Sequence, residues 1–168
     1  MPASKLTVVY SPYMTPDSEA RADALAFAKA HTAGVLATVA KDYSPHASVI
    51  YYVSDETFNI YFLTKRGSRK YNAIKAHPQV AFTVGTQDTP RTLQIEGLAS
   101  ELESTEDREK HIPDLMNVLS QQTSRFVPAG KLDGELSVLW IRPTWIRWAD
   151  FSKKEIGNEN LLVEIPVE

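Results

Sequence analysis

The chain has 168 residues, 43% of them hydrophobic, which suffices for one domain with a sizeable core but not for a second full domain. Because it contains no cysteine, disulfides, thiol nucleophiles and cysteine-ligated metals are excluded. Its net charge of −3 and sequence pI near 5.8 argue against a dedicated nucleic-acid binder, which needs a broad basic face.

Residues 1–16 contain three prolines and no clear period, so we expect an N-terminal arm that packs on the domain or on a partner chain. They lack a basic region followed by an apolar core, and no window of the chain approaches 18 apolar residues. We therefore expect neither a signal peptide nor a membrane association, and a cytoplasmic protein. Residues 17–31 predict an amphipathic helix with Asp17 or Ser18 as its cap.

The next part of the chain favours strands joined by short connections. Residues 35–40 and 46–53 flank a turn that contains Pro45, and they predict a hairpin. Residues 59–63 predict a third strand after a polar turn. Because short connections favour antiparallel pairing, these three strands are expected to form a meander.

Three more strands are expected over residues 80–84, 91–102 and 136–146, the second of them bent at Gly97. Six strands with few helices favour a mainly β, antiparallel barrel with flanking helices, in one domain over residues 1–168.

A further helix is expected within residues 101–119, where the apolar residues change to helical spacing. Ser104 or Thr105 is its predicted cap, and Pro113 is expected to kink or restart it. The acidic residues between 101 and 109 are interpreted as a solvated face. Residues 152–168 are expected to form a C-terminal extension.

A basic turn lies between the third and fourth predicted strands. No Asp or Glu occurs from Thr57 through Gln87, and the cations of this stretch are Lys65, Arg66, Arg69, Lys70 and Lys75. Ser68 predicts the N-cap of a helix over 69–76 that ends before Pro78. Cations in its first turn oppose the helix dipole unless an anion binds there. The spacing alone fits a phosphate site and a solvated turn without a ligand equally well.

The motif in this turn resembles that of the FMN-binding split-barrel family of pyridoxamine 5'-phosphate oxidase. It comprises Thr64 to Lys70, followed by Asn72, Ile74, His77, Pro78 and Val80. The resemblance runs from about Thr32 to Ala99 and more loosely to Phe151. It implies a six-stranded antiparallel split β-barrel that binds FMN.

The resemblance also implies which residues bind the cofactor. Those on the strand beside the isoalloxazine ring are Ser48, Val49, Ile50 and Tyr51. Those at the ring edge and at the phosphate are Leu63, Thr64, Lys65, Ser68, Arg69 and Lys70. Thr92 stands where the oxidase has a flavin-contacting Gln, and Gln94 nearby is its expected substitute.

Two further departures place the chain near the smaller, general-stress and flavin-reductase-like members of this family. Ser48 stands where the oxidase has an Arg, and the oxidase's C-terminal Arg and His motif is missing. The implied function is FMN-dependent hydride or electron transfer from NAD(P)H or another small reductant, with no catalytic side chain required. The implied assembly is a homodimer with the flavin between its subunits.

Two alternatives to this function stay open: a non-catalytic FMN-binding stress-response protein, and a relative that binds deazaflavin or haem. The histidines His46, His77 and His111 lack ligand spacing, so no metal site is predicted. Core packing or a dimer interface is favoured over flavin stacking for Trp140, Trp145 and Trp148.

Overall fold

The computed structural model describes residues 18–85, 90–121, 135–153 and 162–167. The predicted arm, 1–16, lies outside them, as do residues 154–161 and 168 of the predicted C-terminal extension. The helices are α1 (Ser18–Ala30), α2 (Arg69–Ala76), α3 (Thr105–Gln121) and the short 3-10 helix η2 (Phe151–Lys153). The strands are β1 (Ala33–Val39), β2 (Pro45–Tyr51), β3 (Val53–Ser54), β4 (Ile60–Lys65), β5 (Gln79–Gly85), β6 (Arg91–Glu101), β7 (Leu136–Asp150) and β8 (Leu162–Ile165).

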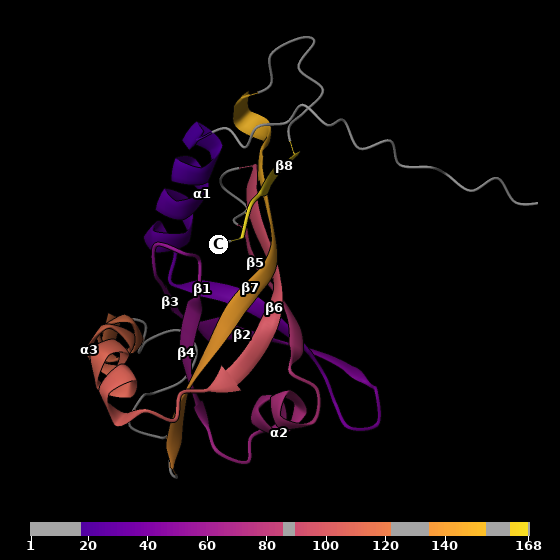
Figure 1. Ribbon diagram of the computed structural model, residues 1–168, viewed down its shortest axis with the longest axis vertical. Helices are drawn as coiled ribbons and strands as arrows, with labels where there is room; N and C mark the ends of the chain where they lie inside the picture. Colours follow the sequence, from indigo (N-terminus) through magenta and orange to yellow (C-terminus); the bar gives the residue numbers. More distant parts are fainter. Residues whose placement is uncertain (1–17, 86–89, 122–134, 154–161, 168) are drawn as a thin grey trace, which may run out of the picture.

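The strands form one antiparallel sheet in the order β2-β1-β5-β6-β7-β4-β3, with β8 paired to β7. The sheet curls into a half-barrel, and α1, α2 and α3 flank it (Figure 1). The prediction of a mainly β, antiparallel split barrel with flanking helices is therefore confirmed. None of the described helices is long and apolar enough to cross a membrane.

The predicted number of six strands is wrong, because the described residues form eight. The strand expected over 46–53 is divided into β2 and β3 at Tyr52. This side chain is fully buried and donates its hydroxyl to the carbonyl oxygen of Ala28, 2.9 Å away. The second additional strand is β8, which arises within the predicted C-terminal extension.

The predicted meander forms only in part. Val53, the last residue of the strand expected over 46–53, lies in β3 and pairs with β4, whereas β2 does not pair with β4, whose other neighbour is β7. The chain is redirected in the turn before β4, where Phe58 adopts a positive φ of 62°. Asp55 stabilises this turn by accepting hydrogen bonds from the backbone N–H groups of Thr57 and Asn59. As a result β2 pairs only with β1 among the described strands.

The main core lies inside the curl of the sheet, where alternate residues of the strands point inward. Its largest fully buried side chains include Tyr52, Phe58, Phe62, Phe82, Leu93 and Ile146. Trp148 belongs to this core and lies 5.0 Å from the ring of Phe27 on α1. Core packing is thus confirmed for Trp148, whereas the half-buried Trp140 packs against a smaller cluster under α3.

The helix α2 has the predicted bounds, and Ser68 is its N-cap: the Ser68 hydroxyl accepts from the backbone N–H of Tyr71 at 3.3 Å. The helix α3 runs continuously through Pro113, so it does not restart there. Ser104 caps α3 by accepting from the backbone N–H of Asp107 at 3.3 Å.

One acidic residue departs from the expected solvated face. The side chain of Glu101, at the end of β6, is only 8% exposed. Its Oε1 accepts from Arg66 Nε (3.1 Å), Arg66 Nη2 (2.6 Å) and Ser137 Oγ (2.8 Å). Its Oε2 accepts from the Tyr71 hydroxyl (2.8 Å) and pairs with Lys75 Nζ at 3.2 Å. Glu101 therefore joins α2 and the preceding turn to β6 and β7.

Burial disfavours the charged form of Glu101, but hydrogen bonds from Arg66, Ser137, Tyr71 and Lys75 outweigh this effect and lower its pKa from 4.5 to about 2. A carboxyl whose pKa is lower in the folded state stabilises the fold fully above its unfolded pKa. This contribution declines as the pH falls from about 4.5 toward 2.

We predict that Glu101→Gln lowers the free energy of unfolding at pH 7 by about 2 kcal/mol, a value reduced for the partial exposure of Arg66 and Lys75. The difference from wild type should shrink between pH 4.5 and pH 2. Urea unfolding followed by tryptophan fluorescence at several pH values measures this difference. Glu103→Gln, at an exposed position two residues later, is the control. A wild-type advantage that stays constant from pH 6 to pH 2 would contradict the prediction.

Candidate functional site

The turn between β4 and α2 is built to leave backbone donors available at the start of the helix. Gly67 adopts a φ of 75°, which is a left-handed conformation that glycine accepts without strain. The Thr64 and Ser68 hydroxyls lie 3.0 Å apart and hydrogen-bond to each other. By their place in the first turn, the N–H groups of Arg69 and Lys70 have no partner within α2. A small anion at this position would accept from them.

The five cations of this region fall into two groups. Arg66 pairs with Glu101 and Glu135, and Lys75 pairs with Glu101. Within the described residues, no acidic side chain lies within ion-pair distance of the three others, which are Lys65, Arg69 and Lys70. Of these three, Arg69 and Lys70 are the cations that the family resemblance assigns to the phosphate, and Lys65 is expected to support them.

The three unpaired cations differ in exposure. Lys65 and Arg69 are exposed, whereas Lys70 is half-buried, and burial lowers the pKa of its ammonium group. A bound anion would oppose this effect because it favours the charged form of the lysine. The local arrangement therefore suits a ligand with concentrated negative charge.

The structure places Ser48, Val49, Ile50 and Tyr51 on the edge strand β2. Ser48 lies opposite the buried Leu36 of β1, and its hydroxyl is buried without a hydrogen-bond partner among the described residues. Such unsatisfied buried groups are uncommon in native proteins. Val49 points to the other face and is 51% exposed. β2 approaches β4 across the barrel, although no ladder joins the two strands.

Leu63 and Thr64 do not share a face, although both were expected at the edge of the ring. Thr64 is buried and bonds to Ser68, whereas Leu63 packs against Tyr61, Leu115 and Val138 on the side that α3 covers. Adjacent residues of a strand point in opposite directions, so this separation follows from the strand itself. The structure brings Thr64, but not the Leu63 side chain, to the turn.

Thr92 and Gln94 lie on β6, away from the basic turn. Gln94 is exposed and pairs with Thr83 and Arg147 across the outer face of the sheet. The end of β6 that reaches α2 is Glu101, seven residues further along, or roughly 20 Å at the rise of a strand. One chain therefore does not bring Gln94 close to the turn.

Glu101 is a site-supporting residue that the sequence interpretation missed. Its signal was present: the buried positions of β6 are Leu93, Ile95, Gly97 and Ala99, and the same alternation places Glu101 on the inner face. The acids that follow it in the chain obscured this pattern.

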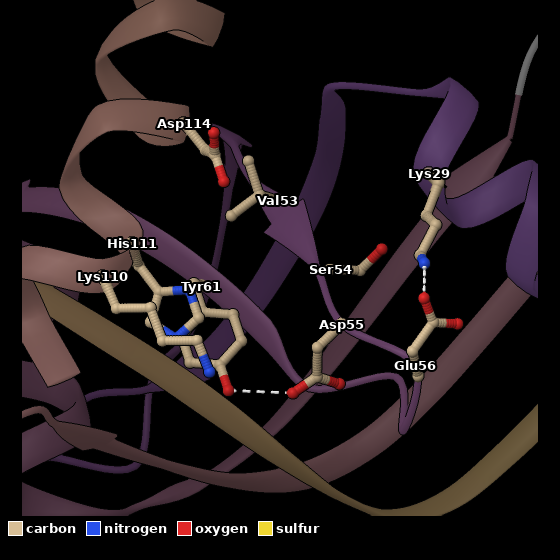
Figure 2. Close-up of a pocket in the computed structure, with 9 residues that line it drawn as sticks. All are labelled: Lys29, Val53, Ser54, Asp55, Glu56, Tyr61, Lys110, His111 and Asp114. Atoms are coloured by element: carbon tan, nitrogen blue, oxygen red, sulfur yellow. Dashed lines mark hydrogen bonds and ion pairs between the residues drawn. The ribbon is translucent and has the colours of Figure 1, made fainter.

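A second feature is a polar pocket of about 270 Å³ on the far side of β4, between α1 and α3 (Figure 2). Its lining residues are Lys29, Val53, Ser54, Asp55, Glu56, Tyr61, Lys110, His111 and Asp114. None of them belongs to the predicted flavin site.

The two stacked rings of this pocket and its Asp55 and Glu56 carboxylates already have partners. His111 stacks on Tyr61 with 3.7 Å between the ring centroids, and the Tyr61 hydroxyl donates to Asp55 Oδ2 at 2.9 Å (Figure 2). Burial and the Asp55 carboxylate raise the pKa of Tyr61, so its phenol stays protonated. Asp55 also accepts bonds from Thr57 and Asn59. These contacts indicate a structural role and leave the basic turn as the stronger candidate site.

No group of three metal-ligating side chains gathers in the parts of the chain that the structure describes. Two of the histidines considered above pack instead against aromatic rings. His77 lies 4.9 Å from Tyr43, and His111 stacks on Tyr61.

Comparison with known proteins matches residues 20–148 to the family model of pyridoxamine 5'-phosphate oxidase. A search of curated proteins finds no match. Among solved structures, the chain is similar to a Listeria innocua protein assigned as a pyridoxamine 5'-phosphate oxidase, with 26% identity and a TM-score of 0.58 over 76% of this chain and 96% of that one. General stress protein 26 of Bacillus anthracis is 25% identical, with a TM-score of 0.57 over 76% and 92% of the two chains.

Structures with lower identity share the fold alone, and their names include three kinds of cofactor. An FAD-binding protein from Mesorhizobium loti has 23% identity and a TM-score of 0.60 over 74% of this chain and 90% of that one. An F420 reductase has 23% identity and a TM-score of 0.57 over 72% of this chain and 93% of that one. A heme-binding protein from Mycobacterium smegmatis has 17% identity and a TM-score of 0.58 over 94% of this chain and 59% of that one. Because the family model covers most of the described barrel, the chain belongs to the pyridoxamine 5'-phosphate oxidase family.

Proposed function

We propose that this protein is an FMN-binding oxidoreductase that passes hydride or electrons between a small-molecule reductant, such as NAD(P)H, and an acceptor. The observation that carries the proposal is the turn before α2, where Lys65, Arg69 and Lys70 have no acidic side chain within ion-pair distance among the described residues. Asp42 acts on Arg69 only at longer range. Three cations and two first-turn N–H groups match the charge and the acceptor oxygens of a phosphate monoester.

Of the remaining predicted residues, Ser48 also fits a flavin. The buried Ser48 hydroxyl lacks a partner within the described chain, and a polar group of the ring would satisfy it. Bound FMN supplies the redox chemistry. The role of the chain is to hold the phosphate at α2, to orient the ring along β2 and to keep water from it.

The proposal includes a homodimer in which two subunits complete each flavin site. Two observations support it. Gln94 lies on the outer face of β6, away from the basic turn of its own chain, which fits a contact from Gln94 to the flavin of a second copy. The outer face of β1, β2 and β5 also exposes a contiguous apolar surface formed by Val35, Ala37, Ala47, Val49 and Ala81. Exposed apolar patches of this kind mark protein interfaces.

The visible spectrum of the purified protein is the first test of the proposal. We expect flavin absorption bands, either as purified or after addition of FMN. A haem or deazaflavin spectrum would show that the protein binds that cofactor instead of FMN. A colourless protein that takes up no FMN would contradict the proposal. Turnover with NADH or NADPH and several electron acceptors then tests catalysis, because a protein that only binds FMN gives stoichiometric reduction.

We predict that Arg69→Ala weakens FMN binding by about ten- to a hundredfold, because it removes a charge-assisted hydrogen bond worth roughly 1.5–3 kcal/mol. Riboflavin, which lacks the phosphate, should bind the variant as it binds wild type. Flavin fluorescence titrations with both ligands give the two affinities.

Lys110→Ala, at an exposed cation on α3, is the control for a general loss of positive charge. Equal losses for FMN and riboflavin would show that Arg69 acts on the ring or on the fold. No loss for either ligand would mean that the turn is solvated and binds no phosphate.

Light scattering at micromolar concentration should give about twice the chain mass of 18.8 kDa. Val35→Glu places a charge in the apolar face and should shift the protein toward monomer, with loss of FMN affinity. Met116→Glu, at an exposed apolar position on α3, should leave both properties unchanged. A monomer with full FMN affinity would refute the shared site.

A further inference from the structure

The Glu101 carboxylate contacts residues on both sides of the proposed phosphate site. Before the site, Arg66 donates to Oε1 through Nε and Nη2. After it, Tyr71 and Lys75 contact Oε2. Between these anchors lie Gly67, Ser68, Arg69 and Lys70, which form the turn and the first residues of α2. One side chain therefore fixes both flanks of a short loop.

The contacts from α2 also set the direction of the helix. Tyr71 and Lys75 are one turn apart, so they project from the same face of α2, and both reach the same carboxylate oxygen. Ser137 of β7 donates its hydroxyl to the other carboxylate oxygen, Oε1, and so ties Glu101 to the neighbouring strand. The start of α2 is thereby fixed relative to the two longest strands of the sheet.

Glu101 also divides the cations of the region. It pairs with Arg66 and Lys75, while Lys65, Arg69 and Lys70 have no acidic side chain within ion-pair distance in the described chain. The Glu101 side chain is 8% exposed, so it reaches cations from beneath the turn and does not occupy its solvent side. A carboxylate at this place orders the turn without neutralising the cations that face a ligand.

We propose that Glu101 is the positioning residue of the phosphate site: by accepting from Arg66, Tyr71 and Lys75 together, it holds the start of α2 in the geometry that binds the phosphate of FMN. This inference rests on the proposed function. It assigns Glu101 no contact with the cofactor, and it therefore predicts a loss of affinity that depends on the phosphate alone.

The test compares the affinities for FMN and riboflavin, measured by flavin fluorescence, in wild type, Glu101→Gln and Tyr71→Phe. The glutamine keeps the size of the side chain but removes the charge and one acceptor oxygen. The phenylalanine keeps the ring and removes a single donor to Oε2. Glu103→Gln is the matched control, and circular dichroism reports whether each variant is folded.

We expect the ratio of FMN to riboflavin affinity to fall roughly tenfold in Glu101→Gln and about threefold in Tyr71→Phe, as for the loss of a charge-assisted network and of one bond within it. Riboflavin affinity should stay unchanged in both. A purely structural role would lower both affinities together and leave their ratio constant. If Glu101→Gln does not fold, Tyr71→Phe carries the test alone.

The possible failures are distinguishable. If wild type binds FMN no better than riboflavin, the proposed phosphate site itself is wrong. If wild type prefers FMN and the folded variants keep or increase that preference, the phosphate site stands and the positioning role of Glu101 is overturned.

Discussion

The pairing of β6 with β7 is the constraint on which the rest of the structure depends. These are the longest strands. β7 also pairs with β4 along its first half and with β8 near its end. The register places Glu101 opposite Leu139, and β4 in turn lies beside the same stretch of β7. A basic turn at the end of β4 is thereby brought over the end of β6, although 35 residues separate Arg66 from Glu101.

At this junction between the basic turn and the end of β6, the arrangement of charges determines which cations remain available to a ligand. A buried carboxylate is costly unless donors surround it, and here hydrogen bonds and ion pairs reach both oxygens. The donors are supplied by α2, by the turn and by β7, so the junction also fixes these elements relative to one another. The cations that have no acidic side chain within ion-pair distance include Arg69 and Lys70, the two in the first turn of the helix. The fold and the proposed ligand site therefore depend on the same set of charges.

Local signals in the sequence predicted local structure well. The Ser68 cap, the bounds of α2 and the β1–β2 hairpin each depend on neighbouring residues, and the structure confirms them. The pairing of β4 with β7 depends on contacts between distant segments, and the short connections indicated only the brief pairing of β3 with β4. Of the site, the sequence indicated the basic turn. It did not reveal that Leu63 faces α3 or that the Glu101 side chain points inward, although both follow from the alternation of side chains along a strand.

The unequal distribution of charge has a consequence for the rate at which a ligand arrives. Residues 57–87 carry five cations and no acid, so the remainder of a chain with net charge −3 carries −8. An anion that diffuses toward the molecule therefore meets a net negative charge from the rest of the chain and a local group of cations at one turn. Such focusing raises the association rate constant, and the effect weakens with added salt because the screening length is about 8 Å at physiological ionic strength. Capture of an anionic ligand would therefore be fast in dilute buffer and slower as salt is added, with less change in the dissociation rate.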